Sequence, residues 1–171
     1  MSFKRFLRSL RLGVAAGALA LAVVSTAQAF ECTTLREADA LDTRVIQNHA
    51  MVAALSCGER GRYNTFVRTF QSDLATQGTV LRQYFHRAYG SQGKVRLDSF
   101  VTSLANRESR RSLSDRAAYC SEASSLFDGL STLTPGYLAE FASSRPVSQD
   151  HGFAACEQRA LNEPAQTSAI R

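Results

Sequence analysis

The chain has 171 residues, with 20 Lys and Arg against 15 Asp and Glu and no tryptophan. This length fits one domain with its own hydrophobic core and indicates no second domain. The formal net charge of +5 comes mainly from the first 29 residues, so the composition does not indicate a basic nucleic-acid-binding surface.

Residues 1–29 have the three parts of a secretory signal peptide. Four basic residues between positions 4 and 11 precede 13 uncharged residues (12–24), and Ala27-Gln28-Ala29 offers small residues for cleavage. The uncharged run is too short for a membrane span. We therefore expect cleavage after Ala29, no membrane span after cleavage, and export to the periplasm, with secretion as the alternative. The mature chain would have 16 basic and 15 acidic residues.

Residues 34–56 predict the first helix. Thr34 and Glu37 have the spacing of an N-terminal capping box, and Gly58 follows as a stop signal. An apolar stripe at helical spacing runs along this segment and consists of Leu41, Val45, Val52 and Leu55.

Residues 63–90 predict a second helix, with Asn64 as its cap. Its apolar stripe consists of Phe66, Phe70, Leu74, Leu81, Tyr84 and Ala88. Aromatic residues at this spacing indicate a packed core rather than a ligand cage. Because glycine weakens a helix, Gly78 indicates either a close helix approach or a kink.

A third helix is expected from about Val95. Its first apolar stripe consists of Leu97, Val101 and Leu104. A second stripe consists of Leu113, Ala117, Cys120, Ala123, Phe127 and Leu130. Leu104 and Leu113 are nine residues apart, which puts them half a turn out of phase. Either the helix breaks near residues 112–114, or it continues and shows different faces to different neighbours.

The rest of the chain is expected to hold short helices and a tail. Pro135 can begin a short helix over residues 135–144, and a loop with a last helical turn near Cys156 follows. Residues 162–171 are expected to be a flexible tail. We therefore predict an all-α, up-down bundle of three long helices with one or two short C-terminal helices, in one helical domain over residues 30–161.

All four cysteines lie in the part expected to be exported, which predicts two disulfides. Cys32 and Cys57 flank the first helix, whose length of about 37 Å puts them out of disulfide reach. The segment from Leu97 to Cys120 is as long as that from Thr34 to Cys57, so Cys57 and Cys120 should meet at one end of the bundle. We therefore favour Cys57–Cys120 and Cys32–Cys156.

Other roles for the cysteines fit the sequence less well. The residues before Cys32 are Phe30 and Glu31, which do not form a lipidation motif. The chain has no C-x-x-C-H haem motif, and its cysteines are much farther apart than zinc ligands usually are. The two disulfides are therefore expected to tie the bundle together and to bring the C-terminal segment back to the start of the mature chain.

Five polar residues interrupt the apolar stripes at similar heights along the three helices. Asn48 and His49 lie on the first helix, Gln77 on the second, and Glu108 and Arg111 on the third. At 1.5 Å per residue, Asn48, Gln77 and Glu108 fall at about 21, 18 and 16 Å from one end. They predict either a small polar pocket, in which His49 and Glu108 handle protons or bind a metal, or an internal hydrogen-bond network. The second interpretation is the more common in helical bundles.

No other segment has a recognisable catalytic, phosphate-binding or metal-binding motif, and no cofactor is expected. His86 is expected on the surface near a helix C-terminus, and His151 in a loop. The arginine-rich residues 106–116 are expected to form a solvated helix face. The sequence therefore favours an exported, non-enzymatic binding or structural component of the cell envelope, whose partner could be another envelope protein. The alternative is a periplasmic enzyme or metal binder that uses His49 and Glu108.

Overall fold

The structure, a computed structural model, describes residues 32–149 and 151–156. The expected signal peptide (1–29) and tail (162–171) lie outside the described residues and stay predictions. Within the described part, the only non-helical pairing is an isolated parallel bridge between Thr33 and Ala155. The helices in chain order are α1 (Leu35–Ser56), α2 (Arg60–Thr69), α3 (Gln71–Tyr89), η2 (Gly90–Gln92), α4 (Gly93–Ser114), α5 (Arg116–Thr132), α6 (Leu138–Ser143) and η3 (Pro146–Gln149).

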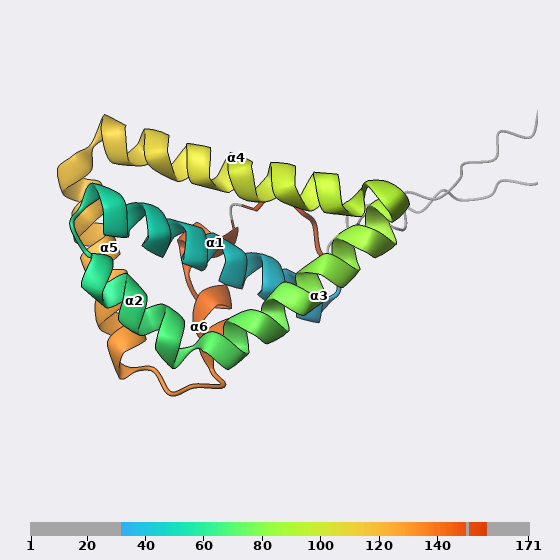
Figure 1. Cartoon of the computed structure of the whole chain (residues 1–171), viewed down its shortest axis with the longest axis horizontal. Helices are drawn as coiled ribbons and strands as arrows, with labels where there is room; N and C mark the ends of the chain where they lie inside the picture. Colours follow the sequence, from blue (N-terminus) through green and yellow to red (C-terminus); the bar gives the residue numbers. More distant parts are fainter. Residues whose placement is uncertain (1–31, 150, 157–171) are drawn as a thin grey trace, which may run out of the picture.

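The all-α fold with three long helices is confirmed. Helices α1 and α4 have 22 residues each and α3 has 19, and the short α6 and η3 follow at the C-terminal side. Helix α1 contacts α3, α4, α5 and α6, so it is the central element. Figure 1 shows α4 along the top of the view, α2 and α3 as a bent pair below, and α5 at the left end. No helix in the described residues is long and apolar enough to cross a membrane.

The start of α1 is the predicted capping box. The Thr34 hydroxyl accepts from the Glu37 backbone N–H at 3.3 Å, and the Glu37 carboxylate accepts from the Thr34 N–H at 2.9 Å. Leu41, Val45 and Val52 are buried as predicted, but Leu55 is 63% exposed. Near the end of α1 the inward face is formed by Ala53 and Ala54 instead.

The predicted second helix is wrong in its start and in its continuity. It begins at Arg60, so Asn64 is inside α2, and it bends at Phe70, where α2 ends and α3 begins. Backbone hydrogen bonds from Phe70 to Phe66 and from Leu74 to Phe70 continue through the bend. Gly78 is not the cause, because a Cβ atom there would meet only ordinary contacts, at 3.6 and 3.8 Å.

The bend divides the apolar stripe of residues 66–88 between two hydrophobic clusters. Helix α2 and the C-terminal half of α1 pack against α5 and α6 in a first cluster built around Ile46, Ala50, Phe66, Phe70, Tyr119, Phe127, Leu130 and Leu138. The N-terminal half of α1 packs against α3 and α4 in a second cluster built around Leu41, Val45, Leu81, Tyr84, Phe85, Phe100 and Leu104.

The third predicted helix breaks at Asp115, which confirms the first of the two alternatives. The Asp115 carboxylate accepts a hydrogen bond from the Ala118 N–H at 3.0 Å and so caps α5. Leu113, the first member of the second predicted stripe, is 83% exposed. The buried stripe of α5 starts at Tyr119 instead.

Both predicted disulfides are present. Cys57–Cys120 joins the end of α1 to α5 with a Cα–Cα distance of 5.6 Å. Cys32–Cys156 joins the two ends of the described chain at 4.9 Å, beside the hydrogen bonds of the Thr33–Ala155 bridge. Disulfides of this kind are compatible with an extracytoplasmic protein.

Candidate functional site

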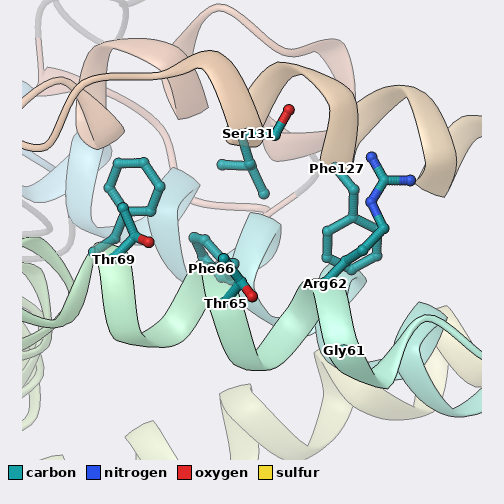
Figure 2. A pocket seen from close by; sticks show the side chains of 9 residues that line it. Gly61, Arg62, Thr65, Phe66, Thr69, Phe127 and Ser131 are labelled. Atoms are coloured by element: carbon teal, nitrogen blue, oxygen red, sulfur yellow. The ribbon is translucent and has the colours of Figure 1, made fainter.

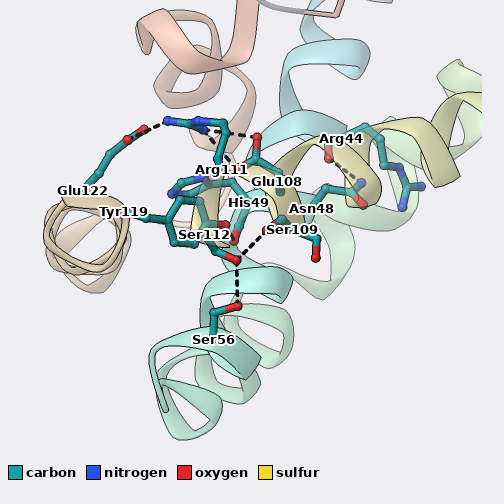
Figure 3. A network of polar contacts seen from close by, with 10 residues as sticks. All are labelled: Arg44, Asn48, His49, Ser56, Glu108, Ser109, Arg111, Ser112, Tyr119 and Glu122. Carbon is teal, nitrogen blue, oxygen red and sulfur yellow. Dashed lines mark hydrogen bonds and ion pairs between the residues drawn. The ribbon is translucent and has the colours of Figure 1, made fainter. Parts of the chain in front are cut away.

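His49 and Glu108 form a buried pair between the two hydrophobic clusters. His49 is on α1 and Glu108 on α4, and their side chains are 1% and 2% exposed. The His49 Nδ1 atom lies 2.6 Å from the Glu108 Oε2 atom. Figure 3 shows the imidazole with Glu108 and Arg111 on one side and the ring of Tyr119 on the other. Two of the five polar residues predicted to lie at similar heights, here called the polar layer, are thus in direct contact.

Arg111 extends this pair to the surface. Its Nη1 atom donates to both carboxylate oxygens of Glu108, at 3.2 and 3.1 Å, and its Nη2 atom donates to Glu122 at 2.7 Å. Burial alone would raise the pKa of Glu108, but the hydrogen bond from His49 and the charges of His49 and Arg111 outweigh it and lower the pKa. Glu108 is therefore an ionised carboxylate at neutral pH.

The ionised Glu108 fixes the orientation of the proton on His49. Because a carboxylate only accepts hydrogen bonds, Nδ1 carries the hydrogen and donates it to Oε2. The buried Nε2 atom on the other side of the ring has no hydrogen-bond partner. Tyr119 donates to the His49 backbone oxygen at 3.4 Å, and burial followed by the Glu108 charge raises the pKa of Tyr119. The tyrosine therefore stays a donor.

A cavity of about 270 Å³ lies over the ring of His49. It is bounded by α5 and by the segment that follows α6, and its lining consists of His49, Glu122, Ser125, Leu126, Arg145, Pro146 and Val147. His49 itself is 0% exposed, so it forms the closed end of this cavity. The sequence prediction included His49 but missed Arg145, a single arginine before Pro146 with no surrounding motif.

Asn48 and Gln77 do not join the His49–Glu108 pair. The Asn48 side-chain nitrogen donates to the Arg44 backbone oxygen at 3.0 Å, and its oxygen is buried without a hydrogen-bond partner. Gln77 on α3 makes no hydrogen bond to the pair, and its side-chain oxygen is likewise without a partner. Of the five predicted residues, only His49, Glu108 and Arg111 contact one another. Tyr119 and Glu122 from α5 also belong to this network.

A second, apolar cavity of about 370 Å³ lies between α2 and α5. Figure 2 shows the rings of Phe66 and Phe127 and the hydroxyls of Thr65, Thr69 and Ser131 around it. Its full lining is Gly61, Arg62, Thr65, Phe66, Thr69, Phe70, Phe127, Leu130 and Ser131. From the sequence alone, the spacing of Phe66 and Phe70 indicates core positions and no cavity, because the bend at Phe70 has no sequence signal.

A separate polar contact, between His151 and Asp42, holds the C-terminal segment on α1. No sequence motif marks it. The His151 Nε2 atom lies 3.5 Å from the Asp42 Oδ1 atom, and both side chains are 8% exposed. The Phe153 N–H donates to His151 Nδ1 at 3.0 Å. This bond makes Nδ1 an acceptor and leaves the hydrogen of the neutral ring on Nε2, facing Asp42. Asp42 precedes His49 by seven residues on α1, and this spacing was the available signal for an inward-facing acid.

None of these polar groups forms a metal site among the described residues, because no three or more His, Cys, Asp or Glu side chains come close enough to hold an ion. Comparison with known proteins gives no family: no protein-family model, no curated protein and no solved structure matches the chain. The functional interpretation therefore depends on the geometry of the two cavities and of the buried polar groups.

Proposed function

We propose that the chain is an exported binding protein that takes up small apolar molecules in the cavity between α2 and α5. One observation carries the proposal: three phenylalanine rings and Leu130 line a cavity of about 370 Å³ that no other described segment fills. Small-molecule sites typically measure about 300–1,000 Å³ and combine an apolar lining with a few polar groups. The volume of this cavity lies near the lower end of that range, and its lining is mainly apolar.

The rim of the cavity supports an apolar ligand rather than a charged one. Arg62 lies over the Phe127 ring at 5.1 Å. Its guanidinium is already paired with Asp128 at 2.5 Å and lies 3.9 Å from Glu59. Because two acids already neutralise the guanidinium, an anionic ligand would gain little there. The threonine and serine hydroxyls at the rim can pair with one polar group of the ligand or with water.

Export is part of the same proposal. The N-terminal signal pattern and the two disulfides support an oxidising compartment, which we propose to be the periplasm, with secretion as the alternative. Another envelope protein remains the proposed class of partner, as the donor or acceptor of the ligand.

A catalytic role of the polar layer stays a second candidate, because His49 has a carboxylate on one nitrogen and no partner on the other. The full burial of both side chains and the additional bonds to Arg111 favour a stabilising network instead.

The proposed site can be tested by filling it. The natural chain has no tryptophan, so Ser131→Trp at the rim introduces a single fluorophore that is expected to occupy the cavity. We expect the wild type to bind the uncharged apolar dye N-phenyl-1-naphthylamine at one saturable site, and Ser131→Trp to weaken this binding at least about tenfold. The Ser131→Trp emission should also be blue-shifted, as for a buried indole.

Ser121→Trp is the matched control, because Ser121 lies on the same helix, is exposed and does not line the cavity. It should keep the dye affinity of the wild type and show the emission of a solvated indole. Equal dye binding by the two variants, or no saturable site in the wild type, would contradict the proposal.

A further inference from the structure

Arg44 on α1 and Arg82 on α3 are two cations that no acid neutralises. In the described part of the chain, neither guanidinium has a carboxylate oxygen within 4.0 Å. Figure 3 shows the side chain of Arg44 pointing away from the Glu108 carboxylate. Burial lowers the pKa of Arg44 and the charge of Arg82 lowers it further, although Tyr63 opposes this effect. A guanidinium nevertheless stays protonated in proteins, so both positive charges remain.

One nitrogen of each guanidinium is held by a neutral acceptor. The Arg44 Nη1 atom donates to the side-chain oxygen of Gln47 at 2.8 Å, and the Arg82 Nη2 atom donates to the Thr79 hydroxyl at 2.9 Å. An amide and a hydroxyl carry no charge, so these bonds orient the two guanidinium groups without neutralising them. Groups that are oriented before a ligand arrives lose less entropy when it binds.

The other nitrogen of each guanidinium lies beside Gly78 on α3. A Cβ atom at Gly78 would lie 3.6 Å from Arg82 Nη1 and 3.8 Å from Arg44 Nη2. Neither of these two nitrogens donates a hydrogen bond to a described residue, in contrast to Arg44 Nη1 and Arg82 Nη2. The missing side chain of Gly78 therefore lets two donors from different helices approach the same point of the α3 backbone.

The charge and the donors of this place indicate what it binds. A ligand with one carboxylate balances only one of the two positive charges, and an amine would be repelled by both. A phosphate group in its dianionic form balances both charges, and its oxygens can accept a hydrogen bond from each arginine. Guanidinium groups also match the geometry of phosphate oxygens. A phosphate group is therefore favoured over a carboxylate or an amine.

We propose that Arg44 and Arg82 bind a phosphate group beside Gly78, either as inorganic phosphate or as part of a phosphate monoester. One phosphate oxygen accepts from Arg44 Nη2 and another accepts from Arg82 Nη1. Arg82 is exposed, so the rest of a monoester can stay in water. None of these residues lines the cavity between α2 and α5, and the site does not depend on the function proposed for that cavity.

An NMR titration of the mature, disulfide-bonded, ¹⁵N-labelled chain tests the proposal. Low ionic strength is needed, because salt screens charges at the surface. We expect inorganic phosphate to give saturable shifts centred on the Gly78 amide. Acetate, which carries one charge, should bind at least about tenfold more weakly. Glycerol 3-phosphate separates the two sources: tighter binding than inorganic phosphate identifies a monoester, and weaker binding identifies inorganic phosphate.

Variants assign the binding to this place. Arg82→Gln should weaken phosphate binding at least about tenfold. Gly78→Val keeps both charges but puts a branched side chain between the two nitrogens, so it should weaken binding as well. Arg110→Gln removes an exposed arginine on α4 and is the matched control, which should leave the affinity unchanged. Ser131→Trp should also leave it unchanged, which separates this site from the cavity between α2 and α5.

The proposal is overturned if inorganic phosphate and glycerol 3-phosphate both give no saturable shift at Gly78, or if acetate binds as tightly as phosphate. It is also overturned if Arg82→Gln or Gly78→Val keeps the wild-type affinity. If Arg110→Gln weakens binding as much as Arg82→Gln, the protein attracts phosphate only through its overall charge. Arg82 is exposed and forms no ion pair with a described residue, so Arg82→Gln is expected to fold, and the amide spectrum shows this directly.

Discussion

Glu108 keeps its charge in the interior because its carboxylate accepts three hydrogen bonds. One hydrogen bond comes from His49 and two come from the Arg111 guanidinium. These contacts lower its pKa despite burial. The stabilisation that the carboxylate provides is therefore present at neutral pH and is lost as the pH falls through the lowered pKa.

Removal of this carboxylate should be costly. Glu108→Ala leaves His49 Nδ1 without its acceptor and frees the inner contacts of Arg111, so we expect the free energy of unfolding to fall by about 3 to 5 kcal/mol. The double variant His49→Leu with Glu108→Leu removes both buried polar groups, so it should recover most of this loss. Urea unfolding, followed by circular dichroism, measures each change.

Glu122→Ala provides the comparison for this prediction, because Glu122 pairs with the same arginine at the exposed end. An exposed ion pair contributes little, so the loss should stay below about 1 kcal/mol. If Glu108→Ala and Glu122→Ala lower the free energy of unfolding by similar amounts, the buried pair stabilises the fold no more than the exposed pair does.

Counting residues along straight helices correctly predicted that His49 and Glu108 lie at the same height. The same count failed for Asn48 and Gln77, which do not contact this pair. Asn48 precedes His49 by one residue, so it lies about 100° around α1 and faces another direction. The position of Gln77 was counted along an unbent second helix, and the bend at Phe70 invalidates that count. Positions on α5 such as Tyr119 and Glu122 could not be included, because the break at Asp115 left the phase of that helix undetermined.

At the scale of elements, the C-terminal segment is held on α1 by a contact whose strength depends on pH. Burial, together with the charge of Asp39, raises the pKa of Asp42 to about 6, although the Ser148 hydroxyl opposes this effect. A proton is then bound more tightly in the folded chain than in the unfolded chain. The free energy of unfolding therefore decreases as the pH rises through the interval from about 4 to about 6.

Asp42→Asn should remove this dependence. We expect the variant to match the wild type near pH 4 and to exceed its free energy of unfolding by about 2 to 3 kcal/mol at pH 7. Urea unfolding at both pH values gives the difference. Asp98→Asn, which changes an exposed acid paired with Lys94, should show no such gain.

The opposite result for Asp42→Asn, a loss of stability at pH 7, would mean that an ionised Asp42 is stabilised by a protonated His151. That outcome would contradict the neutral ring that the Phe153 N–H bond implies.

The elements themselves were predictable to different degrees. The capping box determined the start of α1 because two side chains satisfy backbone groups locally. The bend at Phe70 has no glycine or proline to mark it, and it separates α2, which packs in the first cluster, from the buried residues of α3, which pack in the second. The phase shift between apolar stripes allowed a break near Asp115 but also a continuous helix with two buried faces, and the structure decides for the break.

For the whole molecule, all-α architecture and disulfide pairing followed from helix lengths and from the positions of four cysteines. The two cavities could not be predicted, since one lies between α2 and α5 and the other includes residues of the segment after α6. Neither has a local sequence motif. Fold class thus depends on patterns that recur along the chain, whereas the sites depend on single tertiary contacts.

The proposed export of the chain predicts a defined mature product. We expect intact-mass spectrometry of the protein purified from the expressing cells to give a chain that begins at Phe30, with all four cysteines oxidised. Cell fractionation should place this product outside the cytoplasm. A chain that keeps residues 1–29, or two or more free thiols in the mature chain, would contradict this prediction.

The nested arrangement of the two disulfides also determines how the molecule responds to tension. Cys32–Cys156 connects residues that are 124 positions apart in sequence, and the Cys57–Cys120 loop lies entirely inside it. A pulling force applied at the ends of the chain passes from Cys32 to Cys156 through a covalent bond across 4.9 Å. The helices between them bear none of the load, so the domain resists extension for as long as that bond is intact.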